Sequence, residues 1–161
     1  IAIVCLIYGG ALVVGLLSGS SNPLQPLERI SGAPAKQHLE FEYIKSVDDF
    51  EAARQRAADA GVPLMLDFYA DWCVECVQME HTVFADPAVR AALGEVTALQ
   101  VDVTDYDSAD RALLEQMGVF GPPTLIFYDA NGNEVRGQRL VGTIDAEGFI
   151  QQLRTLTAPR P

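Results

Sequence analysis

Apolar and polar positions divide the chain into three parts. Residues 1–17 are uniformly apolar, and residues 18–38 are rich in Ser, Gly and Pro without any hydrophobic period. From residue 39 onward, short apolar or alternating runs are interleaved with amphipathic stretches of helical period. The pattern predicts an apolar segment (1–17), a flexible linker (18–38) and one folded domain (39–161).

Five strands are predicted within the folded domain. They cover residues 39–44, 63–69, 96–103, 124–129 and 134–141. The second is apolar almost throughout, which is typical of a central strand buried on both faces. Asn131-Gly132-Asn133 lies between the last two strands and predicts a hairpin.

Five helices are predicted from their start and stop signals. They cover residues 46–60, 73–84, a short stretch from 86, 108–117 and 145–156. Ser46 and Asp49 have the spacing of a capping box, and Asp86 precedes a proline at a helix start. The order of elements predicts an α/β fold whose sheet is parallel at first and antiparallel at its end.

The apolar residues 1–17 have the length of a short membrane-spanning helix. A signal peptide is the main alternative, but it requires a basic flank, and residues 1–27 carry no charge. A buried helix of a soluble protein is disfavoured by the linker that follows. We therefore expect the C-terminal part of a transmembrane helix.

Charge and cysteine content narrow the function. The net charge of −11 disfavours nucleic acid as a partner, because phosphates would be repelled. Three cysteines are too few for a disulfide scaffold, and Cys5 in the apolar segment is interpreted as a small apolar residue. His38 and His81 do not supply a second ligand pair, so no metal site is predicted.

Cys73 and Cys76 form a Cys-x-x-Cys motif between a predicted buried strand and a predicted helix. The free N–H groups and the positive dipole end of that helix favour a thiolate at Cys73, and Cys76 is expected to be more buried. Cys73 would attack a partner disulfide and Cys76 would resolve the mixed disulfide. An inert cysteine pair or half of a metal site is the alternative.

The segment LDFYADWCVEC (66–76) resembles the active-site segment of the thioredoxin superfamily, and GPPT (121–124) resembles its cis-proline loop. YADWCVEC, TVFADP (82–87) and VDVT (101–104) are similar more narrowly to the C-terminal periplasmic domain of the DsbD family. The resemblance covers residues 41–156. It implies a thioredoxin-like fold, with a central mixed sheet flanked by helices.

The resemblance also implies roles for residues around the motif. Pro123 would be a cis proline that packs against the disulfide and, with Pro122, presents backbone to a bound partner. An ordinary trans Pro-Pro in a loop is the alternative. Trp72 would shield the cysteines and contact partners, although simple packing also explains an aromatic residue there.

Two acidic residues are further candidates for the catalytic site. Asp67 interrupts a strand that is otherwise apolar, where an unpartnered carboxylate is costly, so it is expected to accept a proton near Cys76. The alternative is a solvated Asp67 near the end of the strand. Glu80 shares a helix face with both cysteines, and the resemblance implies that it joins Asp67 in shaping their reactivity. A solvated helix face is its alternative.

The predicted function is that of a protein-disulfide reductase in which the Cys73–Cys76 pair is the redox group and no other cofactor is needed. The DsbD resemblance implies electron transfer from a membrane-embedded dithiol to periplasmic thiol proteins, with the chain anchored in the bacterial inner membrane and its domain in the periplasm. One alternative is a separate membrane-tethered thioredoxin-like protein, for example in cytochrome c maturation. Another is a non-catalytic binding module with the same fold.

Overall fold

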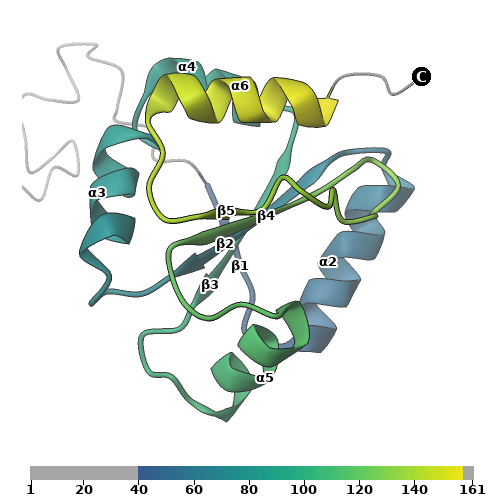
Figure 1. The fold of residues 1–161 in the computed structure, drawn as a ribbon. Coiled ribbons are helices and arrows are strands. Elements are labelled where there is room, and N and C mark those ends of the chain that lie inside the picture. The colour runs from purple at the N-terminus through teal and green to yellow at the C-terminus, as the bar shows by residue number, and fades with distance from the viewer. Residues whose placement is uncertain (1–39, 158–161) are drawn as a thin grey trace, which may run out of the picture. The chain divides into compact units, whose positions relative to one another are not determined.

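A five-stranded sheet lies at the centre of the folded part of the chain (Figure 1). The computed structural model describes residues 40–157, so the predictions for residues 1–17 and 18–38 and for the start of the domain lie outside it. None of the helices in the described range has the length and apolar character needed to cross a lipid bilayer.

The sheet is mixed, with strand order β1-β3-β2-β4-β5. The strands are β1 (Glu42–Tyr43), β2 (Leu64–Tyr69), β3 (Thr97–Asp102), β4 (Thr124–Tyr128) and β5 (Leu140–Val141). The pairs β1–β3 and β2–β3 are parallel, whereas β2–β4 and β4–β5 are antiparallel. This confirms the predicted fold class and places β2 in the middle of the sheet.

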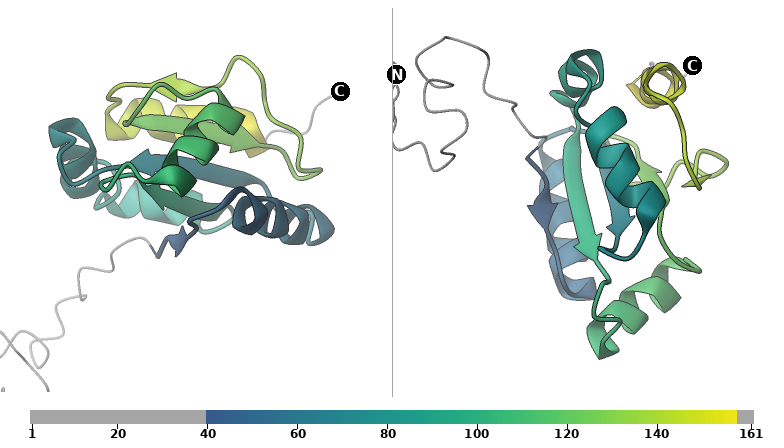
Figure 2. Two further views of the ribbon diagram at one scale, coloured as in Figure 1. Left: turned by 90° about the horizontal axis from the view of Figure 1, so that it is seen from below. Right: turned by 90° about the vertical axis from the view of Figure 1, so that its left-hand side faces the viewer.

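Helices cover both faces of the sheet (Figure 2). They are α2 (Val47–Asp59), α3 (Val74–Thr82), α4 (Pro87–Leu93), α5 (Ser108–Met117) and α6 (Ala146–Thr157). The helices α2 and α5, with Cys76 of α3, contribute to one buried apolar cluster. The helices α4 and α6, with Met79 of α3, contribute to a second cluster. The sheet therefore separates two cores.

Strand β2 supplies side chains to both cores. Leu66 and Phe68 join the cluster that contains α2 and α5, while Met65 joins the other, and all three are fully buried. Side chains of this size stabilise a fold by about 1.5–3 kcal/mol each when fully buried. Because successive side chains alternate between the faces of a strand, Asp67 lies on the same face as Met65.

Local capping signals are present where the sequence predicted them. The Ser46 hydroxyl accepts a hydrogen bond from the Asp49 amide, and the Asp49 carboxylate accepts one from the Ser46 amide, which completes a capping box. The Asp86 carboxylate caps α4, whose first residue is Pro87. Helix α5 ends at Gly118, whose φ of +61° suits a residue without a side chain.

The predicted boundaries need correction at three elements. The strand expected over 134–141 is broken: Glu134 forms an isolated bridge with Tyr128, the chain turns through Gly137 at a φ of +88°, and pairing resumes only in β5. In the first strand, pairing extends only over β1. The helix expected over 73–84 is α3, for which Cys73 is the cap.

Candidate redox-active site

Cys73 and Cys76 are joined by a disulfide at the start of α3, with an S–S distance of 2.05 Å. Cys73 is the N-cap, and its Sγ accepts a hydrogen bond of 3.2 Å from the Cys76 amide. A helix N-terminus with a donor aimed at sulfur stabilises negative charge there. The geometry therefore favours Cys73 as the thiolate of the reduced pair.

The sequence predicted that Cys76 would be more buried than Cys73, but the two residues are buried to the same extent. Their exposed fractions are 5% for Cys73 and 4% for Cys76. The difference between them lies in the helix: Cys73 precedes its first turn, whereas Cys76 is inside it. Asymmetry of reactivity must therefore come from the helix dipole and neighbouring groups rather than from access alone.

The Pro122–Pro123 peptide bond is cis, in agreement with the predicted geometry of Pro123. The Pro123 carbonyl accepts a hydrogen bond of 3.0 Å from the Gly142 amide, just beyond β5. The Thr124 hydroxyl donates to the Gly121 carbonyl at 2.7 Å. These contacts fix the loop in front of β4, with Pro123 buried and Pro122 partly exposed.

Asp67 is buried in the middle of the sheet, with 4% of its surface exposed, which excludes the alternative of a solvated carboxylate. Burial is the main cause that raises its pKa to about 7. A hydrogen bond from the Gln100 side chain opposes that rise, and the charge of Glu80 adds to it. Glu80 is therefore close enough to Asp67 for their charges to interact. Its role in cysteine reactivity stays a prediction.

Gln100 is a member of the site that the sequence analysis missed. It lies in β3 directly beside Asp67 in the parallel ladder, and its Nε2 donates to Asp67 Oδ2 at 2.8 Å. Its side chain is only 1% exposed. A single amide within a strand of apolar residues was the available signal, because buried polar groups require partners.

Replacing Gln100 with leucine is expected to raise the pKa of Asp67 further above 7. The substitution removes a hydrogen bond that favours the charged carboxylate, while burial and the charge of Glu80 remain. The measurement is a pH titration of the Asp67 carboxyl carbon by NMR in the oxidised chain. An unchanged or lowered midpoint would contradict this assignment of Gln100.

Exposed apolar side chains lie next to the Cys-x-x-Cys motif in the chain and just before the proline loop. Trp72 is 57% exposed and Val74 is 78% exposed, and Phe120, which precedes the proline loop, is fully exposed. The indole Nε1 of Trp72 donates to the Thr104 carbonyl at 3.1 Å. Trp72 is therefore held at the surface by one polar contact rather than packed in the core, which disfavours the simple packing alternative.

Residues 40–157 contain no group of three or more His, Cys, Asp and Glu side chains placed to hold a metal ion. A central mixed sheet, a disulfide at a helix start and a cis proline together define a thiol–disulfide oxidoreductase of the thioredoxin type.

Comparison with known proteins agrees with this class. Residues 50–157 match the thioredoxin-like domain family, so the chain belongs to that family. The DsbD resemblance is also confirmed. The chain is 43% identical over 159 residues to the thiol:disulfide interchange protein DsbD of Ralstonia nicotianae, covering 96% of this chain. It is 44% identical over 122 residues to DsbD of Escherichia coli K12, covering 76% of this chain.

The matched region is only part of those relatives. The chain spans 26% of the Ralstonia protein and 21% of the Escherichia coli protein. Among solved structures, the oxidised C-terminal domain of Neisseria meningitidis DsbD has a TM-score of 0.61 and 29% identity, covering 71% of this chain and 99% of that one. The described domain is thus similar to one terminal domain of a longer protein.

Proposed function

We propose that this chain is a protein-disulfide reductase in which Cys73 and Cys76 carry two electrons at a time. The observation that carries the proposal is the disulfide at the start of α3. The strand β2 that precedes it carries a buried carboxyl, Asp67, whose pKa lies near neutrality. Proton transfer is most efficient when the acceptor pKa is near the working pH. Asp67 has the properties of such an acceptor.

The reaction begins with the reduced pair. The Cys73 thiolate attacks one sulfur of a partner disulfide, forms a mixed disulfide and releases the other partner sulfur as a thiolate, which takes up a proton. Cys76 then loses its proton to Asp67 and attacks Cys73 Sγ. The Cys73–Cys76 bond forms, the mixed disulfide breaks, and the partner leaves with both of its sulfurs reduced.

Glu80 and the surface residues have supporting roles in this proposal. The charge of Glu80 raises the pKa of Asp67, which keeps that carboxyl ready to exchange a proton near neutral pH. Trp72 offers apolar surface to a protein partner. The fixed loop of Pro122 and Pro123 offers backbone to the partner chain, because a proline cannot donate a hydrogen bond that would compete.

The wider organisation of the chain belongs to the same proposal. Residues 1–17 would be the C-terminal part of a membrane helix, residues 18–38 a flexible tether and residues 39–161 the redox domain. By analogy with relatives named thiol:disulfide interchange proteins, the electron donor would be a membrane-embedded dithiol and the acceptors periplasmic thiol proteins. The domain would then work in the periplasm at the bacterial inner membrane, with the cysteine pair as its only redox group.

The proposal is tested by a single-turnover reaction between the reduced chain and oxidised insulin. One disulfide should form in the chain for each insulin disulfide that is reduced, as counted by mass spectrometry after thiol alkylation. Cys73→Ala serves as the control and should reduce none. Insulin left oxidised by the wild-type chain, or reduced equally by Cys73→Ala, would refute reductase activity at this pair.

A further inference from the structure

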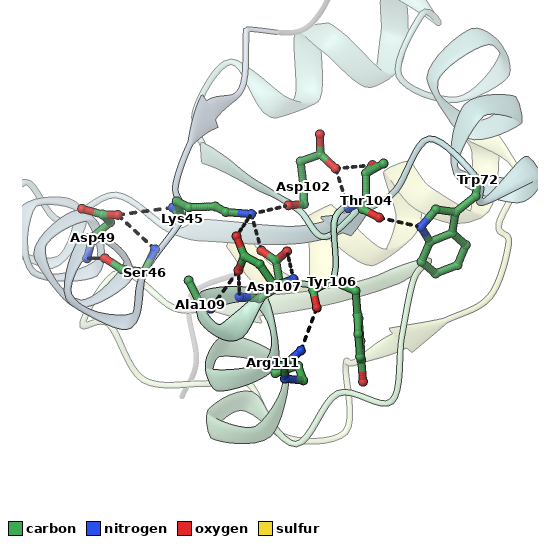
Figure 3. A network of polar contacts seen from close by, with 11 residues as sticks. Lys45, Ser46, Asp49, Trp72, Asp102, Thr104, Tyr106, Asp107, Ala109 and Arg111 are labelled. Atoms are coloured by element: carbon green, nitrogen blue, oxygen red, sulfur yellow. Dashed lines mark hydrogen bonds and ion pairs between the residues drawn. The ribbon is translucent and has the colours of Figure 1, made fainter.

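Thr104 connects the end of β3 to the turn that precedes the cysteines. Its hydroxyl accepts a hydrogen bond of 2.8 Å from the Asp71 amide, and its carbonyl accepts the bond from the Trp72 indole. The same hydroxyl donates to the carboxylate of Asp102. One half-buried residue therefore holds both residues that lead into Cys73. Figure 3 shows its bonds to Trp72 and Asp102.

The loop that carries Thr104 is anchored on its other side by Lys45 (Figure 3). The ammonium group of Lys45 bonds to the fully buried carboxylate of Asp110 at 2.5 Å, lies 3.3 Å from the Asp107 carboxylate, and donates to the Asp102 carbonyl at 3.4 Å. These contacts connect the start of α2, the end of β3 and the start of α5. The segment that carries Thr104 is therefore held in place by α2 and α5 and is not a free loop.

We propose that Thr104 is a positioning residue that sets the orientation of Trp72 for reaction with protein disulfides. The inference rests on the proposed reductase function and deepens it. Trp72 is largely exposed, so packing alone does not fix its ring, and its indole bond to Thr104 supplies the missing restraint. A preset side chain loses less conformational entropy when a protein partner binds.

The hydroxyl of Thr104 is central to this role. A hydroxyl supplies one donor and accepts at its lone pairs, and here it donates to Asp102 while accepting from the Asp71 amide. Valine has nearly the same shape but neither function, whereas serine retains both. Thr104→Val should therefore remove the acceptor of the Asp71 amide and loosen the turn that carries Trp72. Thr104→Ser should keep this hydrogen bond and the turn in place.

Fluorescence reads the orientation directly, because Trp72 is the only tryptophan of the 161-residue chain. In the whole oxidised chain, Thr104→Val should increase the amplitude of fast indole motion in time-resolved anisotropy. Thr104→Ser should match the wild-type chain. Thr155→Val is the matched control, because it removes a hydroxyl that also bonds two partners but lies on α6. Equal anisotropy decays in the wild-type and Thr104→Val chains would overturn the proposal.

Kinetics then separate positioning from a general structural role. Loss of one hydrogen bond corresponds to about a two- to tenfold change in rate, so Thr104→Val should reduce insulin more slowly by about that factor. Its rate with the small disulfide of hydroxyethyl disulfide should change by less than about twofold, since that substrate does not need the Trp72 surface. Equal slowing with both substrates, or no rescue by serine, would contradict positioning. A wild-type chain inactive on insulin would instead refute the reductase function, leaving the anisotropy result to stand alone.

Discussion

Replacing Cys76 with serine is expected to trap the chain in a covalent mixed disulfide with its partner protein. Cys73 caps α3 and receives the Cys76 amide hydrogen bond, so it is the sulfur favoured as thiolate and nucleophile. Without the second thiol, the step that releases the partner cannot occur, and turnover should stop. The measurement is the appearance of an insulin adduct on non-reducing gels, with the linkage to Cys73 located by mass spectrometry.

The reciprocal variant, Cys73→Ser, is the matched control. The two cysteine residues are almost equally buried, so a difference in adduct yield between the two variants cannot be ascribed to residue exposure alone. Cys73→Ser should form little adduct, because the remaining sulfur lies inside the helix. Recovery of Cys76-linked adducts at the yield of the first variant would overturn the assignment of nucleophile and resolving cysteine.

Asp67→Asn is expected to slow the resolving step by about 100-fold, at the lower end of the range that a positioned proton acceptor contributes. Asparagine keeps the shape of the side chain but cannot take the Cys76 proton. The wild-type rate should rise with pH through the Asp67 pKa of about 7, and the variant should lack that inflection. Stopped-flow measurement of decay of the mixed disulfide from about pH 5 to 9 gives both results. A wild-type rate and profile in the variant would mean that Asp67 has no part in proton transfer.

Although Asp67→Asn should slow the resolving step, it should increase the stability of the folded chain. The Asp67 pKa is 3.8 in its ordinary environment and about 7 in the folded chain, so the folded state binds more protons between these values. Wild-type stability is therefore lost as the pH rises from about 4 through about 7. Relative to wild type, Asp67→Asn should gain up to about 4 kcal/mol in free energy of unfolding between about pH 4 and pH 8.

Urea unfolding of the oxidised chains at the two pH values measures this gain. Asp59→Asn, at the exposed end of α2, is the matched control, and its free energy of unfolding should follow that of the wild-type chain. If Asp67→Asn slows thiol–disulfide exchange but raises the free energy of unfolding at high pH, the Asp67 carboxylate assists the reaction and destabilises the folded chain. A variant less stable at both pH values would show that the carboxylate itself holds the strands together.

Sequence patterns predicted most of the fold because its signals are local. Ser46 with Asp49, Asp86 before a proline, and Gly118 each mark a helix end through contacts within a few residues. The prediction of one continuous strand over residues 134–141 was wrong, because the backbone turns at Gly137 and pairing with β4 resumes only at Leu140. A hydrophobic pattern alone does not report such an interruption.

The residues of the candidate site also fall into those that the local sequence predicts and those that it does not. Cys73, Cys76 and the cis geometry at Pro123 follow from short motifs, and the buried position of Asp67 follows from the apolar residues around it. Gln100 and Thr104 do not, because each meets its partner across two parallel strands or their ends, 32 or 33 residues apart in the chain. Such contacts depend on strand register, which a single sequence leaves open.

The reduction potential of the Cys73–Cys76 pair tests the central claim most directly. Glu75 lies between the two cysteines in the chain, and a negative charge there disfavours the thiolate and so favours the disulfide, which makes the reduced pair a better electron donor. The whole chain is equilibrated in glutathione and dithiothreitol buffers, and the oxidised fraction is measured. A value of roughly −200 to −270 mV, the range of glutaredoxins and thioredoxin, is expected for a reductase. A value near about −120 mV, typical of a strong oxidant, would contradict the account and make the chain a donor of disulfides.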